Sequence, residues 1–370
     1  MTALPKGMRL LMTSDAAGGV WTYALDLAEG LAGQGIEVVL AVLGPAPAPA
    51  LAARAAAVPG LRLRITDLPL DWLAASPGEV LDAASAIAEL ARTEGVDLIH
   101  LNSPAHAAGA TFPVPVVAVS HSCVATWWDA VRGGELPEDF AWRTDLVRRG
   151  MLGASALVMP SRAFAEATAR RYGLPRPPVT VYNGRRAAPA VEPAPDAPPL
   201  FALTAGRLWD EGKNLGTLDR AAARLDLPVL AAGDLSGPNG ARVEAHHLRP
   251  LGQLGGAELA GLLACRPIYV SLALYEPFGL AVTEAAQAGC PLVLSDIPGL
   301  RELWEGTALF VPARDEEAAA EAIERLSVNP AERARLGAAA RDRASRYTVE
   351  AMVQGMLGVY RGVLAQGIAA

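Results

Sequence analysis

The sequence contains few residues that bind metals or form disulfides. Of its 370 residues, three are cysteine and five are histidine. Cys123, Cys265 and Cys290 are far apart, and none lies in a paired spacing. Neither a disulfide framework nor a zinc site is therefore expected. No cluster of carboxylates and histidines can be identified along the chain, so we predict no metal site of another kind.

Long apolar runs and an excess of positive charge are also missing. No run approaches the roughly 18 apolar residues of a membrane-spanning helix, and residues 1–7 lack the basic-then-apolar layout of a signal peptide. We therefore expect a soluble, cytoplasmic protein. The net charge of −7 argues against a nucleic-acid partner. With 52% hydrophobic and 19% charged residues, the composition is typical of a globular protein rather than a disordered one.

One stretch departs from this acidic balance. Between Arg143 and Arg186 the chain holds nine arginines, and its only acidic residues there are Asp145 and Glu166. One interpretation is a solvated helix face. The other is a surface for an anionic acceptor or for anionic lipid head groups, which would give weak peripheral membrane contact.

The chain predicts two α/β domains. Short aliphatic and β-branched runs alternate with helical patterns throughout, which favours parallel sheets with crossover helices. A proline- and alanine-rich stretch over residues 186–199 is typical of a semi-rigid linker. It would separate an N-terminal domain, residues 1–185, from a C-terminal domain, residues 200–346. Three helical patterns follow the last strand, and we expect the final one, about 347–370, to cross back and complete the first domain.

The individual elements follow from the same patterns. In the first half, helices are expected over Trp21–Gln34 and Pro77–Glu94, and strands over Arg9–Thr13, Glu37–Val42, Leu61–Ile65, Asp97–Leu101, Val114–Val119, Ala156–Met159 and Val179–Tyr182. In the second half, strands are expected over Leu200–Thr204, Pro228–Ala232, Leu248–Gly252, Ile268–Ser271, Leu292–Leu294 and Ala308–Val311.

The most informative segment contains two glutamates eight positions apart. Glu276 ends the apolar run that contains strand 268–271, and Glu284 falls inside a helix expected to begin near Gly279. Two carboxylates so placed could bind two different hydroxyl pairs of one extended ligand. The free N–H groups at the helix start lie between them and suit a phosphate. A sugar, a diphosphate and a ribose have these chemical needs in this order.

A second junction follows the first strand of the second domain. Arg207 and Lys213 bring two positive charges into the loop before the next helix, and Asn214 could cap that helix. Two cations beside a helix N-terminus suit a diphosphate that gains charge as it departs. The alternative is that the two cations only pair with Asp210 and Glu211 on the surface.

The first strand of the chain leads into a glycine pair, Gly18-Gly19, and then a helix. Glycine permits positive φ and close backbone approach, as loops that face a phosphate require. Any tight turn uses such a pair, so the signal is weak by itself. Neither a P-loop nor a dinucleotide-binding fingerprint is present.

Strand 114–119 ends next to a histidine and an aromatic pair. His121 could hydrogen-bond a sugar hydroxyl, and Trp127 or Trp128 could stack on a pyranose ring. Asn102 follows the previous strand and could point into the same crevice, on the acceptor side. A core histidine and two packing tryptophans are the alternative. The other histidines considered are expected to be structural: His100, His246 and His247.

These motifs in this order resemble the retaining glycosyltransferases of the GT-B fold, most closely family 4. Glu276 and Glu284 are similar to that family's E-x7-E motif, Gly206-Arg207-Leu208 with Lys213-Asn214 to its donor-phosphate motif, and Gly18-Gly19 to its N-terminal glycine loop. The likeness covers nearly the whole chain and is looser in the first domain. Leu272 stands where relatives often have proline, which removes no chemical group.

The resemblance implies two Rossmann-like domains that face a cleft, with a nucleotide-sugar donor held mainly by the second. It implies that Arg207 and Lys213 bind the diphosphate, that Glu276 meets the sugar hydroxyls and Glu284 the ribose, and that His121 faces the sugar. It also implies a front-side route, in which the leaving diphosphate accepts the acceptor's proton, and no need for a metal or another cofactor.

Further donor contacts are expected from the amides of Gly279 and Leu280, and the loop that contains Leu254 is expected to border the base. The donor could be a UDP-, GDP- or ADP-sugar, and the acceptor a carbohydrate, a lipid-linked sugar or a small molecule. The alternatives are a GT-B sugar-nucleotide epimerase, a phosphorylase, and a non-catalytic sugar-nucleotide-binding protein.

Overall fold

The computed structural model describes residues 4–5, 7–16, 18–188, 191–237 and 240–369. The chain forms two compact units. Unit 1 comprises residues 1–184 and 349–370, and unit 2 comprises residues 185–348. The chain therefore passes between the units twice, after Gly184 and after Thr348.

Unit 1 is built on a parallel sheet of seven strands in the order β3-β2-β1-β4-β5-β6-β7. The strands are β1 (Arg9–Ser14), β2 (Glu37–Val42), β3 (Leu61–Ile65), β4 (Leu98–Leu101), β5 (Val116–Val119), β6 (Ala156–Met159) and β7 (Val179–Thr180). Chain order reverses direction between β1 and β4, which is the topological switch point of a Rossmann-like sheet.

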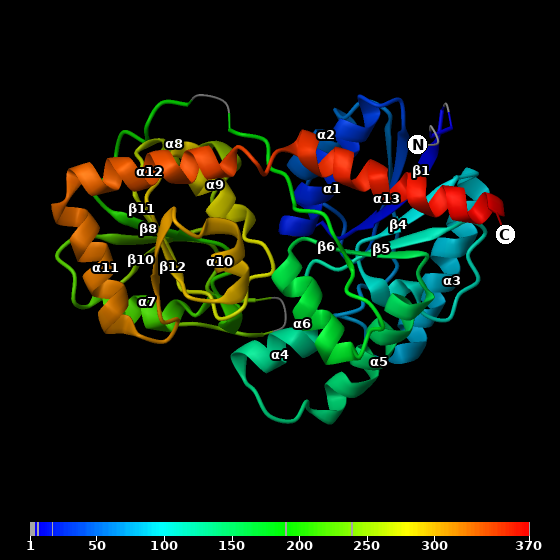
Figure 1. Cartoon of the computed structure of the whole chain (residues 1–370), viewed down its shortest axis with the longest axis horizontal. Coiled ribbons are helices and arrows are strands. Elements are labelled where there is room, and N and C mark those ends of the chain that lie inside the picture. The colour runs from blue at the N-terminus through cyan, green and yellow to red at the C-terminus, as the bar shows by residue number, and fades with distance from the viewer. Residues whose placement is uncertain (1–3, 6, 17, 189–190, 238–239, 370) are drawn as a thin grey trace. The chain divides into compact units, whose positions relative to one another are not determined.

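Helices cover both faces of this sheet, so its central strands are apolar on both sides. Alternate residues of β1 show the pattern: Leu10 and Met12 face α1 (Gly19–Ala32) and α13 (Val349–Ala369), whereas Leu11 faces α3 (Pro77–Glu94). Figure 1 shows α13 lying along α1. The remaining helices are α2 (Pro49–Ala56), α4 (Val124–Val131), α5 (Glu138–Gly153), α6 (Arg162–Tyr172) and the 3-10 helix η1 (Pro104–Ala107).

Unit 2 repeats this plan with six parallel strands in the order β10-β9-β8-β11-β12-β13. They are β8 (Ala202–Ala205), β9 (Val229–Ala232), β10 (Arg249–Gly252), β11 (Ile268–Ser271), β12 (Leu292–Ser295) and β13 (Ala308–Val311). The switch point lies between β8 and β11.

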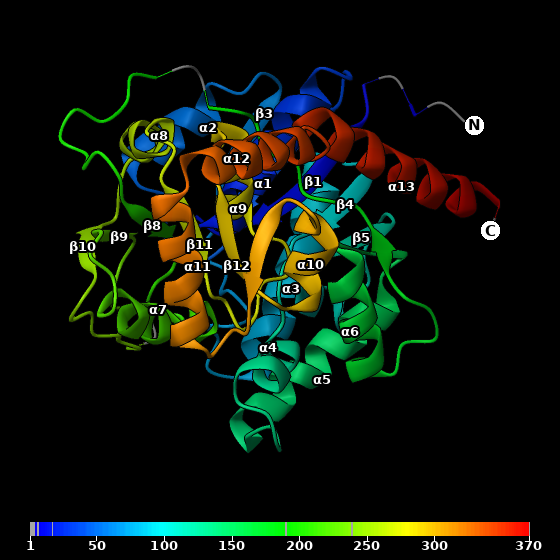
Figure 2. The ribbon, with the colours of Figure 1, turned by 60° about the vertical axis from the view of Figure 1, so that its left-hand side comes forward.

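Two apolar clusters hold the helices of unit 2 on its sheet. One face carries α8 (Gly256–Ala264), α9 (Leu280–Ala288), α10 (Pro298–Trp304) and α12 (Pro330–Ala344). The other face carries α7 (Leu215–Ala222) and α11 (Glu316–Val328), and the 3-10 helix η2 (Glu211–Lys213) lies in the loop before α7. Figure 2 shows α12 beside α9.

The structure confirms the predicted fold, two parallel-sheet units with a final helix that returns to the first. Several elements agree with their predicted bounds, whereas the strand expected over Val179–Tyr182 ends at Thr180 because β7 is an edge strand that pairs only with β6. The described part of the stretch predicted as a linker belongs to unit 2. There the Ala194 N–H donates to the Gly261 carbonyl at 3.0 Å. Within the described residues, no helix is both long and apolar enough to cross a membrane.

The docking of α13 on α1 can be tested at one glycine. A Cβ atom at Gly30 of α1 would lie 2.4 Å from Val353 Cγ2 of α13. We expect Gly30→Ala to lower the free energy of unfolding by about 1–3 kcal/mol through overpacking. The measurement is a urea titration.

Gly358 on the exposed side of α13 is the matched control. A Cβ atom there meets nothing within 4 Å, so Gly358→Ala should raise stability by about 0.5–1 kcal/mol through helix propensity. Equal effects of the two substitutions would contradict this packing.

Candidate active site

The predicted site residues of unit 2 lie on two loops at the switch point of its sheet. The loop with Arg207 and Lys213 follows β8, and the loop with Glu276 follows β11. Because β8 and β11 pair in parallel, their carboxyl ends meet at the same edge. The Leu274 N–H donates to the Gly212 carbonyl at 2.8 Å, which joins the two loops directly.

Lys213 and Glu276 form an ion pair. Lys213 Nζ donates to Glu276 Oε2 at 2.6 Å, and the two side chains are 24% and 12% exposed. The sequence offered Asp210 and Glu211 as alternative partners for Lys213. The carboxylate that Lys213 Nζ contacts is instead that of Glu276, on the loop after β11. A cation and a carboxylate that are 63 positions apart in the chain are therefore in direct contact where the two loops meet.

Arg207 pairs with Asp210 on the surface, which was the alternative to diphosphate binding considered from the sequence. Its guanidinium lies 3.6 Å from Asp210 Oδ2 and beside the Trp209 ring, and its side chain is 56% exposed. Such an exposed pair adds little stability. Arg207 is thus on the same loop as Lys213 and accessible to an anion.

Asn214 does not cap α7 as expected. Its φ is 57°, and its side chain instead donates to the carbonyls of Leu272 and Ala313 at 2.9 and 2.6 Å. The left-handed backbone turns the amide away from the first N–H groups of α7. Asn214 therefore holds the loop after β8 against the end of β11.

Glu284 has a partner that the sequence did not predict. Arg185 Nε donates to Glu284 Oε1 at 2.5 Å, and Gln287 Nε2, one turn further along α9, donates to the Arg185 carbonyl at 2.7 Å. Arg185 is the first residue of unit 2. In the sequence it is one of nine similar arginines, and no local signal connects it with a residue 99 positions away.

The Tyr269 side chain of β11 lies close enough to both glutamates for their charges to affect its pKa. Burial, and then the negative charges of Glu284 and Glu276, raise the pKa of the Tyr269 phenol far above its usual range. Its hydroxyl donates to the Ala205 carbonyl at the end of β8. The two carboxylates thus share one neighbourhood at the switch point.

Close backbone contacts position the segment between the glutamates. Gly279 has φ of 90° and stands directly before α9, whose first N–H groups have no acceptor within the helix. A Cβ atom at Gly299, in α10, would lie 2.7 Å from the Glu276 carbonyl oxygen. Leu280 is the first residue of α9, and Leu254 packs part-buried against the core beside α8.

The predicted residues of unit 1 lie at the corresponding edge of its sheet. Gly18, directly before α1, has φ of 75°, as its glycine pair predicted. Asn102 follows β4 and His121 follows β5, and His121 Nε2 lies 2.8 Å from Asn102 Oδ1. His100, which was expected to be structural, also contacts Asn102 Oδ1, through its Nε2 at 3.0 Å.

Both of these histidines are held neutral. Burial, and secondarily the nearby His100 ring, lower the pKa of His121 to about 3. Burial lowers the pKa of His100 to about 4, although its hydrogen bond with Asn102 opposes the shift. The Tyr23 ring packs edge-on against His121 with the ring centroids 4.5 Å apart. At neutral pH, His121 is therefore an uncharged hydrogen-bonding group.

The aromatic pair lies on α4. The rings of Trp127 and Trp128 have centroids 6.3 Å apart, and Trp128 also packs on Phe140 of α5. Both side chains are part-buried. This contact gives Trp128 a packing role, and stacking of either ring on an acceptor sugar stays a prediction.

Some arginines of the basic stretch are engaged within their own unit. Arg143 donates to the carbonyls of Asp71 and Ala74, and Arg148 to that of Tyr172. The exposed ones on or just after α6 are Arg162, Arg170, Arg171 and Arg176. Contact of this surface with an anionic partner or a membrane stays a prediction.

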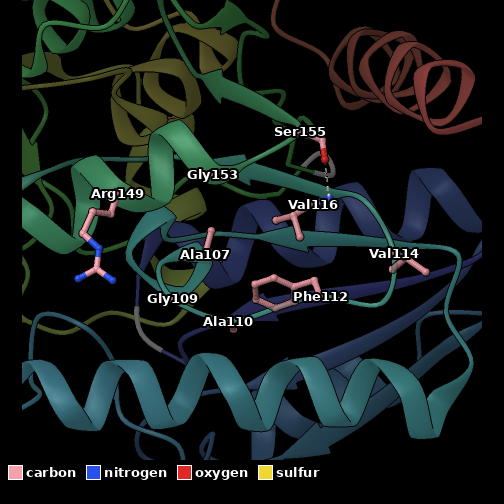
Figure 3. Close-up of a pocket in the computed structure, with 9 residues that line it drawn as sticks. All are labelled: Ala107, Gly109, Ala110, Phe112, Val114, Val116, Arg149, Gly153 and Ser155. Atoms are coloured by element: carbon pink, nitrogen blue, oxygen red, sulfur yellow. Dashed lines mark hydrogen bonds between the residues drawn. The ribbon is translucent and has the colours of Figure 1, made fainter. Parts of the chain in front are cut away.

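A pocket of about 410 Å³ lies at the opposite edge of the unit 1 sheet, near the start of β5 (Figure 3). Its wall is formed mainly by small and apolar residues such as Ala107 and Phe112, and Arg149 stands at one end. None of its nine lining residues is a predicted site residue. Among the residues that the structure describes, no group of three His, Cys, Asp or Glu side chains is arranged to hold a metal ion.

Two family models match the chain. Glycosyltransferase Family 4 matches residues 17–187, and Glycosyl transferases group 1 matches residues 192–343. The first match ends at residue 187, three residues after Gly184, where the chain leaves unit 1, and the second match ends at residue 343, before α13.

Curated relatives are similar over parts of their length. A D-inositol 3-phosphate glycosyltransferase of Saccharomonospora viridis is 27% identical over 68% of this chain and 65% of the relative. A glycogen synthase of Mycobacterium tuberculosis is 29% identical over 67% of this chain and 64% of the relative. A GDP-mannose-dependent alpha-mannosyltransferase of Mycolicibacterium smegmatis is 32% identical over 47% and 46%. The chain thus matches less than two thirds of the length of each.

Solved structures share the fold over almost the whole chain. A sucrose-phosphate synthase from Thermosynechococcus elongatus has a TM-score of 0.78 at 21% identity and covers 97% of this chain and 100% of its own. Anabaena Alr3699/HepE in complex with UDP-glucose has a TM-score of 0.73 at 19% identity and covers 96% and 100%. The two-domain fold is therefore that of these proteins.

The neutral state of His121 predicts a pH dependence of stability. Its lowered pKa means that the unfolded chain binds a proton near pH 6.5 while the folded chain does not. The stabilisation is complete above pH 6.5 and declines as pH falls toward the folded pKa. The difference in unfolding free energy between the wild type and His121→Gln should shrink by about 1–2 kcal/mol from pH 7 to pH 5.

Urea titrations at both pH values measure this difference. His246→Gln is the control, because the His246 side chain is 67% exposed and lies 3.4 Å from the carboxylate of Glu244, which is also exposed. It should follow the wild type at both pH values. A constant difference between the wild type and His121→Gln would contradict the neutral state of His121.

Proposed function

The chain belongs to family 4 of the glycosyltransferases, with the GT-B fold, and we propose that it is a retaining enzyme that moves a hexose from a nucleoside-diphosphate sugar to a hydroxyl acceptor. The observation that carries this proposal is the pairing of both predicted glutamates with cations on either side of the α9 N-terminus. Lys213 holds Glu276, and Arg185 holds Glu284. The donor's sugar, diphosphate and ribose need groups in this order.

Lys213 can serve the diphosphate without leaving Glu276. An ammonium group has three N–H donors, and the ion pair uses one of them. The others can reach phosphate oxygens, together with Arg207 and the free N–H groups of α9. The attraction between these groups and the diphosphate strengthens as the diphosphate departs and gains negative charge. It therefore stabilises the transition state more than the bound donor.

Glu276 and Glu284 serve the two ends of the donor. Lys213 holds Glu276 in place, where it can accept from sugar hydroxyls and stabilise positive charge that develops at the anomeric carbon. Arg185 contacts Oε1 of Glu284, and the second carboxylate oxygen can accept from a ribose hydroxyl. His121 accepts from a further sugar hydroxyl.

Transfer follows a front-side route. The C1–O bond to the diphosphate breaks, the acceptor oxygen forms the new C1–O bond on the same face, and the leaving phosphate oxygen takes the acceptor's proton. Configuration at C1 is retained without a covalent enzyme intermediate. Lys213 and Arg207 supply the positive charge that a metal ion supplies in other transferases, so we propose that no metal is required.

The proposed donor can carry one of three nucleotide bases. One relative is named as GDP-mannose-dependent, and a structural neighbour is described in complex with UDP-glucose. Both names support a nucleoside-diphosphate sugar for this chain, whether UDP-, GDP- or ADP-linked. The acceptor is a hydroxyl of a carbohydrate, a lipid-linked sugar or a small molecule.

The ion pair between the two loops predicts a loss of turnover. Lys213→Ala and Glu276→Ala should each lower the rate of sugar transfer, or of donor hydrolysis, by at least about 100-fold, because each removes a charge at the reacting centre. The rates are followed by release of the nucleoside diphosphate. Circular dichroism should show an unchanged fold.

Glu316→Ala provides the matched control. Glu316 pairs with Arg220 at 3.4 Å, on α11 and α7 of the same unit, so its loss removes an ion pair outside the site. Its turnover should equal that of the wild type. Near-normal turnover of either site variant would overturn the assignment, whereas donor conversion that needs no acceptor and inverts a sugar centre would favour an epimerase.

A diphosphate preference predicts which nucleotides stabilise the protein. At a concentration 100-fold above its Kd, the matching nucleotide among UDP, GDP and ADP should stabilise the fold by about 2.7 kcal/mol. The corresponding monophosphate, which lacks the group that Lys213 and Arg207 would bind, should stabilise it clearly less. Thermal unfolding with each of the six nucleotides measures this. Equal shifts with mono- and diphosphates would contradict the diphosphate contacts.

A further inference from the structure

Unit 1 contains a chain of hydrogen-bonded polar side chains, of which the proposed transfer uses only the last, His121. It consists of His100 on β4, Asn102 after β4 and Tyr360 on α13, and it ends at His121. His100 and Tyr360 are both fully buried. Buried polar groups are costly unless hydrogen-bonded, so the order of donors and acceptors in this chain carries information.

The orientation of the Asn102 amide can be deduced from its neighbours. Its Nδ2 lies 2.6 Å from the Thr13 carbonyl oxygen, which can only accept, so Nδ2 donates there. Its backbone N–H donates to Thr13 Oγ1 at 3.0 Å. Asn102 is thereby held against the end of β1 with Oδ1 turned toward both histidines.

This orientation defines the tautomers of the two rings. Asn102 Oδ1 has no proton, and Nε2 of His100 and Nε2 of His121 lie 3.0 and 2.8 Å from it. Both rings must therefore donate from Nε2. Because both are neutral at pH 7, Nδ1 of each ring is an acceptor.

Tyr360 satisfies the acceptor of His100. Its hydroxyl lies 2.7 Å from His100 Nδ1 and donates to it, since the protonated nitrogen of that ring is Nε2. The Tyr360 pKa lies well above its usual value, mainly through burial, so the hydroxyl keeps its proton. The resulting order is Tyr360 O–H to His100, His100 to Asn102, with His121 donating to the same Asn102 oxygen.

We propose that Tyr360 is a positioning residue for His121: beside the bonds to Thr13, the bond from Tyr360 through His100 is a second restraint on the Asn102 amide, whose Oδ1 holds the His121 ring with Nδ1 as the acceptor for a substrate hydroxyl. α13 thus completes the site as well as the core of unit 1. Tyr23, which packs on His121, holds the ring from a second side. The catalytic consequence rests on the proposed glycosyl transfer, whereas the tautomer of His121 does not.

The expected response to losing the hydroxyl follows from these bonds. In Tyr360→Phe the ring packing remains, but His100 Nδ1 loses its donor and becomes a buried unsatisfied acceptor. His100 keeps its proton on Nε2, because the other tautomer would set a lone pair against Asn102 Oδ1, but the ring is no longer held at Nδ1. The Asn102 amide loses one of its restraints, and the bond from His121 Nε2 to Oδ1 is held less firmly.

The first experiment records the tautomers directly. Nitrogen-15 spectra of the full-length protein with labelled histidine distinguish a protonated from an unprotonated ring nitrogen, and His100→Gln and His121→Gln assign the signals. The wild type should show both rings with a proton on Nε2 only. Tyr360→Phe should keep the protons on Nε2 but shift the signal of His100 Nδ1, which loses its donor, and the signals of His121, whose bond to Asn102 is held less firmly.

The second experiment measures turnover of the matching donor and acceptor. Tyr360→Phe should lower kcat by about tenfold, the equivalent of one buried hydrogen bond of ~1.4 kcal/mol, with an unchanged KM for the donor. Val363→Ala is the control, because Val363 is a buried apolar residue on the same helix and outside the polar chain. It should loosen α13 packing but leave the tautomers and kcat unchanged.

The outcomes separate this proposal from the proposed function. His121 signals that are the same in Tyr360→Phe and the wild type overturn the proposal, whatever the activity. A His121 protonated on Nδ1 in the wild type also overturns it, and the wild-type spectrum decides this even if Tyr360→Phe does not fold. If the His121 signals respond but no donor is turned over by any variant, the proposed function fails and the positioning of His121 stands.

Discussion

The parallel pairing of the first strand of each unit with its fourth is the constraint on which the candidate sites depend. β1 pairs with β4 in unit 1 and β8 with β11 in unit 2, and chain order reverses at both places. The loops after these strands therefore diverge from one edge and leave space for side chains. Asn102 bonds Thr13 across one switch point, and Lys213 bonds Glu276 across the other.

Charge at the unit 2 site is balanced before any ligand binds. Each part-buried glutamate has a cationic partner, and the charges of both help to raise the pKa of the Tyr269 phenol. An unpaired charge in a part-buried position would be costly. The pairs hold both carboxylates in place, which is the preorganised state that catalysis by electrostatic stabilisation needs. Unit 1 uses the opposite means, because burial keeps its histidines uncharged.

Much of the site was predictable because its signals are local. Strand Ile268–Ser271 and the helix start near Gly279 follow from apolar runs and a glycine, so the positions of Glu276 and Glu284 could be inferred with them. Their partners could not be inferred in the same way. Arg185 lies 99 positions from Glu284, and Tyr360 lies 260 positions from His100. Asn214 was assigned a local cap by its type, but its backbone turned left-handed and its amide bonded two distant carbonyls.

The sequence by itself determined the alternation of strands and helices, the two-domain fold and the residue types that suit a nucleotide-sugar donor. These depend on hydrophobic period, glycine placement and short spacings, which act between near neighbours in the chain. Tertiary structure alone decided which charges pair and which tautomer each histidine adopts. Those outcomes depend on distances across the sheet edge and on burial by the last helix, and both exist only once distant segments have packed together.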